Sequence, residues 1–90
     1  MGEWSTTTNK KHGYGVMLYW YDRLYEGYWK NDLRNGRGRT IWPSGGMYEG
    51  EYKDDKKHGF GIYVWSDGRV YKGNWMRGKQ HGLGIYTVPS

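Results

Sequence analysis

One short pattern returns along this chain at a fixed interval of 23 residues, and it constrains the fold more than any other feature. The pattern is Tyr-x-Gly, and its copies start at Tyr25, Tyr48 and Tyr71. A second motif, Gly-x-Gly, keeps the same interval, with copies that start at Gly13, Gly36, Gly59 and Gly82. Flexible linkers do not place glycine at regular intervals. The spacing therefore indicates a repeat protein, whose short units are stable only when they stack on their neighbours.

Four repeats account for the chain as one domain over residues 1–90. Their approximate bounds are 2–24, 25–47, 48–70 and 71–88. The first repeat is less regular, because the segment from Trp4 to His12 is two residues longer than its counterpart from Trp29 to Asn35. We interpret the extra length as an insertion within residues 5–9, and we expect the chain to be a fragment of a larger protein.

Aromatic residues take the place of aliphatic ones as candidates for the core. The chain has 6 Trp, 10 Tyr and 16 Gly, and aromatic side chains bury large areas. In three of the repeats, aromatic residues stand two positions before and two positions after one glycine. We therefore expect the rings to lie across bare glycine backbone. The predicted core residues of the repeats are Tyr25, Gly27, Trp29, Tyr48, Gly50, Tyr52, Tyr71, Gly73 and Trp75.

The segments around both motifs read as short β-strands, because they are rich in aromatic residues and partly alternate. The first set is Leu24–Lys30, Met47–Lys53 and Val70–Met76, and the second set is Gly13–Tyr19, Gly36–Trp42, Gly59–Trp65 and Gly82–Val88. Polar stretches of four to six residues between them, such as Asn31–Asn35, are expected to be hairpin loops. Each repeat is then one β-hairpin. The expected fold is all-β: an elongated, twisted antiparallel β-meander, a solenoid-like stack of hairpins.

The combined motif resembles the MORN repeat. It reads Tyr-x-Gly-x-Trp, a short loop, His-Gly-x-Gly, an aromatic residue and an Asp-Gly turn, and its copies cover residues 2–88. Two departures are Asn35, which replaces the histidine, and Gly78, where the preceding loops have Asp32 and Asp55. The resemblance implies an elongated twisted sheet that acts as a tether or scaffold, binds partner proteins, associates with itself or lies against membranes. It also implies phosphoinositide binding as a candidate activity.

No catalytic constellation, cofactor-binding motif or metal site is expected. His12, His58 and His81 recur near the repeat interval, but equivalent positions in stacked hairpins lie about 9.6 Å apart, too far to share one zinc ion. The Gly-x-Gly pairs precede strands rather than helices, so they do not fit a dinucleotide-binding loop. We therefore expect a chain without enzymatic activity, although a parent protein could carry a separate catalytic domain.

The composition also bears on location. The chain has no cysteine, which excludes disulfides and thiolate metal sites and fits an intracellular protein. No apolar run approaches the roughly 20 residues of a membrane span. We expect an intracellular, cytoplasmic location, with a peripheral position at a membrane or the cytoskeleton as the alternative.

The leading functional hypothesis is a non-enzymatic interaction or scaffold module that binds or tethers proteins along its sheet. A single-layer sheet cannot cover both of its faces, so an uncovered apolar face implies a protein partner or a second copy of the chain. We predict that partner-binding aromatic residues recur late in the second strand of the repeats. These residues are Tyr19, Trp42 and Trp65.

The alternative hypothesis is recognition of anionic phospholipid, either phosphoinositide or phosphatidylserine. The formal net charge is +5, and stacked hairpins would align basic loop residues along one edge. Each such residue contributes about 1 kcal/mol near an anionic membrane. The candidates are Lys10, Lys11, Arg34, Arg37, Lys56, Lys57 and Lys79. Single-stranded nucleic acid is a weaker third hypothesis, because the rings that base stacking requires are assigned to the core.

Overall fold

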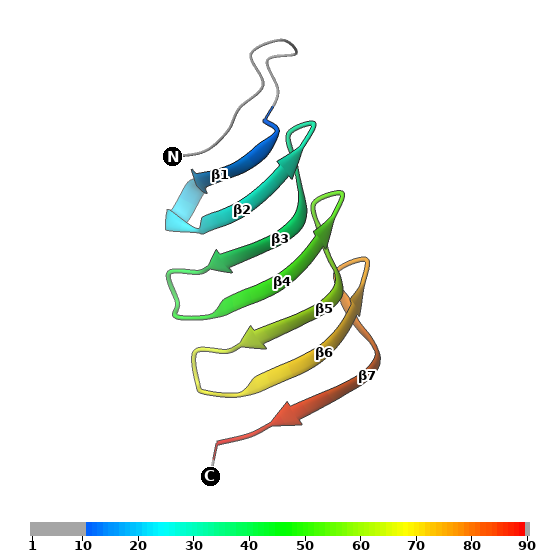
Figure 1. The fold of residues 1–90 in the computed structure, drawn as a ribbon. Coiled ribbons are helices and arrows are strands. Elements are labelled where there is room, and N and C mark those ends of the chain that lie inside the picture. Colours follow the sequence, from blue (N-terminus) through cyan, green and yellow to red (C-terminus); the bar gives the residue numbers. More distant parts are fainter. Residues whose placement is uncertain (1–10, 90) are drawn as a thin grey trace.

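The described residues, 11–89 of the computed structural model, form one antiparallel sheet of seven strands. The strands are adjacent in chain order from the first to the last, and Figure 1 shows them stacked one below another. The sheet is an open meander, and each strand is strongly curved (Figure 1). The predicted all-β antiparallel meander is therefore confirmed.

The strand bounds follow the repeat interval. The strands that carry Tyr-x-Gly have the predicted bounds: β2 (Leu24–Lys30), β4 (Met47–Lys53) and β6 (Val70–Met76). The strands that carry Gly-x-Gly are β1 (Gly13–Leu18), β3 (Leu33–Ile41), β5 (Lys56–Val64) and β7 (Lys79–Thr87). A single 3-10 turn, η1 (Trp20–Asp22), connects β1 to β2. Compared with the prediction, β3, β5 and β7 begin three residues earlier and all four Gly-x-Gly strands end one residue earlier.

The hairpin loops are shorter than the four to six residues predicted. Each of the three hairpin loops within residues 11–89 has two residues with positive φ, as at Asn31 (50°) and Asp32 (69°), whereas the insertion predicted within residues 5–9 lies outside the described residues. Such a turn matches the right-handed twist of the strands beside it, and Asn, Asp and Gly adopt it readily. The loop prediction was wrong because residues that were assigned to the loops, such as Leu33–Asn35, belong to the strand that follows the turn.

A row of glycines crosses all seven strands. Read through the strand register, the row is Gly15, Gly27, Gly38, Gly50, Gly61, Gly73 and Gly84. A Cβ atom placed on Gly38 would lie 2.6 Å from the ring atoms Cε1 and Cζ of Tyr25. The same relation holds for Gly61 under Tyr48 and Gly84 under Tyr71. The 23-residue interval thus aligns bare backbone under tyrosine rings.

Six rings form the core on one face of the sheet, which we call the ring face. They are Tyr25, Trp29, Tyr48, Tyr52, Tyr71 and Trp75, and none is more than 6% exposed. Successive rings meet edge to face, with centroids 5.0–5.5 Å apart. Each such pair contributes about 0.5–1.5 kcal/mol beyond the burial of its area. Because the rings of one hairpin contact those of the next, each hairpin depends on its neighbours.

The backbone satisfies the polar atoms of most of the buried rings, and the Tyr52 hydroxyl pairs with the Thr40 hydroxyl. The hydroxyl groups of Tyr25, Tyr48 and Tyr71 donate to the carbonyl three residues later, at 2.9, 2.8 and 3.1 Å. The indole N–H of Trp75 donates to the Gly61 carbonyl at 3.2 Å. Burial of these groups therefore leaves no unpaired hydroxyl or indole to oppose folding.

The opposite face, which we call the outer face, carries a mixture of charged and apolar side chains. Arg39 pairs with Glu26 at 3.1 Å, and Arg37 lies 3.6 Å from Glu49 and 3.8 Å from Glu51. These side chains are all at least one-third exposed, so the ion pairs contribute little stability. The core therefore lies on the ring face.

Candidate functional site

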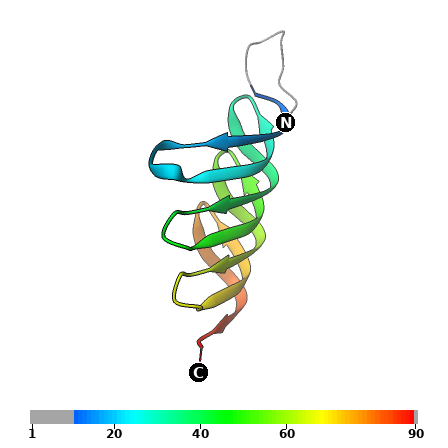
Figure 2. The ribbon, with the colours of Figure 1, turned by 90° about the vertical axis from the view of Figure 1, so that its left-hand side faces the viewer.

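Three turns link successive hairpins along one side of the sheet, at residues 19–23, 42–46 and 65–69. We call these residues the turn edge, and Figure 2 shows the turns one below another. Each turn begins with an aromatic residue whose backbone N–H donates to the carbonyl at the end of the turn. The bonds are Tyr19 to Arg23 at 2.7 Å, Trp42 to Gly46 at 2.9 Å and Trp65 to Arg69 at 2.9 Å. The predicted partner-binding residues therefore lie directly after β1, β3 and β5.

The rings of Tyr19, Trp42 and Trp65 are partly buried and pack against the core. The guanidinium group of Arg23 lies 4.4 Å from the Tyr19 ring, and that of Arg69 lies 5.0 Å from the Trp65 ring. The prediction took these rings to lie on a strand and to be free. The structure instead places them in turns and folds them back onto the ring face, so only part of each ring reaches solvent.

The first turn carries two aromatic residues that sequence reasoning missed. Trp20 is 87% exposed and Tyr21 is 88% exposed, whereas the other turns have Pro43-Ser44 and Ser66-Asp67 at the same positions. Tyr21 has φ 61° and ψ 30°, a left-handed conformation that costs a bulky residue about 1–2 kcal/mol. The signal that could have found them is the break in the repeat, because this turn lacks the glycine of the other two.

Among the hollows along the turn edge, two are lined by Trp42. The larger measures about 440 Å³ and is lined by Tyr19, Trp20, Tyr21, Arg23, Trp42 and Pro43. The smaller measures about 200 Å³ and is lined by Trp42, Ser44, Gly46, Tyr63, Trp65 and Ser66. Both are shallow and open, and they combine aromatic walls with one arginine. This arrangement suits apolar side chains of another protein more than a small substrate that must be enclosed.

Several of the basic residues that we assigned to one edge lie on the ring face instead. Lys11 is 5.2 Å from the Trp29 ring, Arg34 is 5.2 Å from the Tyr52 ring, and Lys57 is 5.5 Å from the Trp75 ring. The distances are those from the charged group to the ring centroid. Because a cation is attracted to an aromatic face, these side chains bend over the core and are not displayed to solvent as a stripe.

Arg34 is further fixed by Asp55. The Asp55 carboxylate accepts hydrogen bonds from the Arg34 side chain at 2.7 Å and from its backbone N–H at 3.1 Å. Burial favours the neutral acid, but the hydrogen bonds from Arg34 outweigh it and hold the pKa of Asp55 below its usual range. Arg34 is therefore engaged within the chain.

The remaining lipid candidates are divided among different parts of the surface. Arg37 is ion-paired on the outer face, and Lys56 and Lys79 are exposed at the starts of β5 and β7. Lys10 lies outside the described residues. Within residues 11–89, the predicted basic loop residues therefore do not form one exposed stripe along a single edge.

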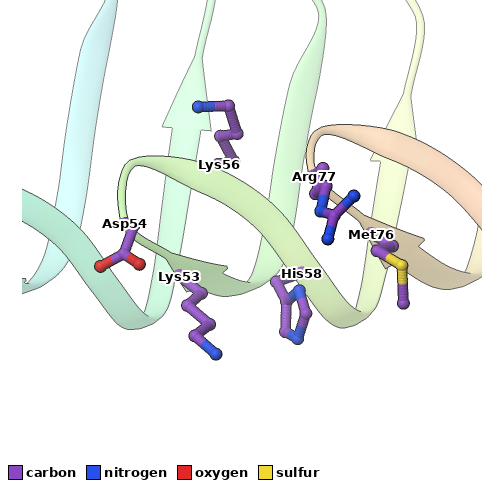
Figure 3. A pocket seen from close by; sticks show the side chains of 6 residues that line it. All are labelled: Lys53, Asp54, Lys56, His58, Met76 and Arg77. Carbon is purple, nitrogen blue, oxygen red and sulfur yellow. The ribbon is translucent and has the colours of Figure 1, made fainter.

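A basic hollow of about 410 Å³ does exist at the hairpin loops, lined by Lys53, Asp54, Lys56, His58, Met76 and Arg77. Figure 3 shows Lys53 and His58 extending to one side of the hairpin, whereas Lys56 points to the other side. The basic groups that line this hollow thus do not converge on one point. Of the predicted lipid-binding residues, only Lys56 lines this hollow.

The family of the chain follows from the repeat and the fold together. The MORN repeat family matches residues 9–19, 25–47, 48–68 and 71–90, so the chain belongs to the MORN repeat family. The second, third and fourth matches begin at the first residue of the predicted repeats. A comparison with individual curated proteins gave no match. Within residues 11–89, no helix is long and apolar enough to cross a membrane.

Proposed function

We propose that this chain is a non-enzymatic interaction module that binds a segment of a partner protein along its turn edge. The observation that carries the proposal is the exposed pair Trp20 and Tyr21. Their rings are almost completely in solvent, and the backbone at Tyr21 is in a costly conformation. The fold does not require either feature, because the other two turns have no aromatic residue at these two positions.

The residue types at this edge are those that dominate protein interfaces. Trp, Tyr and Arg are enriched among residues whose truncation costs the most binding energy. Trp20 and Tyr21 flank the larger hollow, and Arg23 and Trp42 line its remaining sides. A partner segment with apolar side chains would cover the exposed rings and fill both hollows, which lie in successive turns.

Replacing Trp20 and Tyr21 together with serine is expected to abolish this binding without unfolding the chain. Serine is found at these positions in the other turns, as Ser66 and Ser44. Peptides selected from a display library by the wild-type chain should bind the double variant about 30-fold more weakly or worse, since a hot spot contributes about 2 kcal/mol or more. Fluorescence polarisation measures the affinity, and thermal unfolding checks the fold.

The matched control removes exposed apolar rings and side chains from the outer face. Phe60 is 53% exposed and Leu83 is 86% exposed, so Phe60→Ser/Leu83→Ser deletes comparable surface elsewhere. We expect this control to bind the selected peptides normally, and we expect the binding to change little between 0.05 and 0.5 M salt. Equal binding by the wild type and the Trp20/Tyr21 variant would contradict the proposal.

Recognition of anionic phospholipid is the second candidate, and the basic hollow at the hairpin loops is the observation that favours it. It is lined by four basic residues, Lys53, Lys56, His58 and Arg77, and by one acidic residue, Asp54. We rank it below protein binding because three predicted lipid ligands are bent over the ring face and one is ion-paired on the outer face.

The lipid alternative makes its own prediction for vesicle sedimentation. If it holds, the chain should sediment with vesicles that contain phosphatidylserine or phosphoinositide at about 0.15 M salt and not with neutral vesicles. Lys56→Glu/Arg77→Glu should then abolish sedimentation, whereas Lys30→Glu/Lys72→Glu, which changes the charge equally at other places, should not. No sedimentation of the wild type with acidic vesicles would remove this candidate.

A further inference from the structure

Two of the cations on the ring face have a carboxylate partner at the same spacing. The Asp32 carboxylate accepts a hydrogen bond from the Lys11 backbone N–H at 2.8 Å and lies 3.0 Å from its Nζ atom. The Asp55 carboxylate makes the same two contacts with Arg34, at 3.1 and 2.7 Å. In both cases the acid stands 21 residues after the cation, at the second position of the next hairpin loop. An ion pair is therefore part of the repeated structure.

The third copy of this arrangement has the cation without the acid. Lys57 follows Arg34 by the repeat interval, and the residue 21 positions further on is Gly78. The loop itself is unchanged, because the Gly78 N–H donates to the Lys57 carbonyl at 3.0 Å, as the Asp55 N–H does to Arg34 at 2.9 Å. The φ angle is also similar, 83° at Gly78 and 75° at Asp55. The backbone is thus in place for a carboxylate that this residue cannot supply.

The position that the missing side chain would occupy is open. A Cβ atom placed on Gly78 would meet no other atom within 4 Å. At the same time the ammonium group of Lys57 is held in place by three rings, with centroids 5.7 Å away for Tyr48 and Tyr63 and 5.5 Å away for Trp75. The Lys57 cation is therefore held in place, and the side-chain position at Gly78 is open.

The positive charges around Lys57 favour the binding of an anion beside it. Its pKa is lowered, mainly by burial and further by the positive charges of Arg34 and Arg23. Across residues 11–89, no carboxylate forms an ion pair with Lys57. In the same part of the chain, the Nε atom of Arg23 is buried without a hydrogen-bond acceptor. A half-buried cation among other cations is costly until an anion joins it.

We propose that Lys57 and the open space at Gly78 form a binding site for a carboxylate side chain, Asp or Glu, of a partner protein. The proposal rests on the function proposed above and adds the chemistry of the partner. A carboxylate is the group that the chain itself uses at both equivalent places, where it accepts from a backbone N–H and a cationic side chain. Because Gly78 lies in a hairpin loop, at the opposite ends of the strands from the turn edge, the partner protein should present this acidic residue separately from the segment that binds the turn edge.

The test compares Gly78→Asp with Gly78→Asn. Both side chains fill the space, and both residues tolerate positive φ, but only Asp supplies the charge. Gly78→Asp should pair with Lys57 and raise the midpoint of thermal unfolding by several degrees relative to Gly78→Asn. Equal midpoints for the two variants would show that a carboxylate at this position does not stabilise the fold by pairing with Lys57, and would overturn the proposal.

Binding is measured directly by NMR, through the Lys57 Cε–Hε signal. The probes are acetyl-Gly-Glu-Gly-amide, its Gln counterpart and inorganic phosphate, each at constant ionic strength. The Glu peptide should move the Lys57 signal in a saturable manner, the Gln peptide should not, and Gly78→Asp should weaken the effect at least tenfold. No saturable shift with the Glu peptide, or an equal response to phosphate, would overturn a carboxylate-specific site.

Failure of this inference can be told apart from failure of the proposed function. Library peptides that depend on Trp20 and Tyr21, together with no response of Lys57 to the Glu peptide, would overturn only the carboxylate site. A saturable Lys57 response without any peptide that depends on Trp20 and Tyr21 would support the carboxylate site and overturn only binding at the turn edge.

Discussion

Tyr48→Ala is expected to unfold the chain or to bring it to the margin of stability. Tyr48 has no exposed surface, and its ring contacts Tyr52, Trp75 and Tyr63 at centroid distances of 5.2, 5.5 and 6.4 Å. Truncation of a large buried ring costs about 3–5 kcal/mol. Small domains are stable by only about 5–15 kcal/mol, so urea unfolding followed by tryptophan fluorescence should show a large loss.

Two controls separate the contribution of the buried ring to stability from that of its hydroxyl group and from that of an exposed ring. Tyr48→Phe removes only the hydrogen bond to the Glu51 carbonyl and should cost about 1 kcal/mol. Phe60→Ala, on the outer face, removes a ring that is 53% exposed and should cost less than the core substitution. A loss for Tyr48→Ala no greater than that for Phe60→Ala would contradict a core made of stacked rings.

Gly38→Ala is expected to destabilise the chain by about 3 kcal/mol or more, although it adds one methyl group. The new Cβ would overlap the Tyr25 ring, whose atoms Cε1 and Cζ would be 2.6 Å away. Tyr25 has no exposed surface, so its ring cannot move aside without leaving the core. The expected result is a large fall in the midpoint of urea or thermal unfolding.

Gly46→Ala is the matched control for this substitution. A Cβ atom at Gly46 would be 3.5 Å from the Val64 carbonyl oxygen and 3.7 Å from a Trp42 ring carbon, which is ordinary contact. Gly46 does not have positive φ, so alanine should fit with a change of less than about 1 kcal/mol. Similar losses at Gly38 and Gly46 would show that the glycine row has no special role.

Much of the fold follows from the sequence because one local rule is repeated. The Tyr-x-Gly-x-Trp pattern determines which side chains of a strand face the core. The predicted bounds of one such strand, Leu24–Lys30, agree with the structure to the residue. The glycine between the aromatic residues also has a clear physical meaning, since a ring lies across it. Stacking then follows from the need of each hairpin for neighbours.

The lengths of the hairpin loops could not be predicted from the polarity of the residues alone. Arg34 and Asn35 are polar, yet both belong to β3, which begins directly after a two-residue turn. The turn depends on the positive φ of Asn31 and Asp32, a conformation that many Asn and Asp residues do not adopt. Polar composition therefore suggested a longer loop than the backbone forms.

The candidate site was harder to predict, because side-chain direction depends on the curvature of the whole sheet. Arg34 and Lys57 look like exposed loop cations, but the early start of β3 and β5 places them over rings. The more informative signals were breaks in the repeat. The Trp20-Tyr21 pair and Gly78 each differ from their equivalents, and each coincides with a feature that the fold does not need.

The central claim is that a protein partner is bound at the first turn of the turn edge, and site-specific photo-crosslinking in cells tests it most directly. A photo-reactive phenylalanine derivative is placed at position 21, and separately at position 72, which is exposed on β6. Our account predicts a discrete covalent adduct with another protein from position 21 and none from position 72. The absence of any protein adduct from position 21, or the same adduct from both positions, would contradict it.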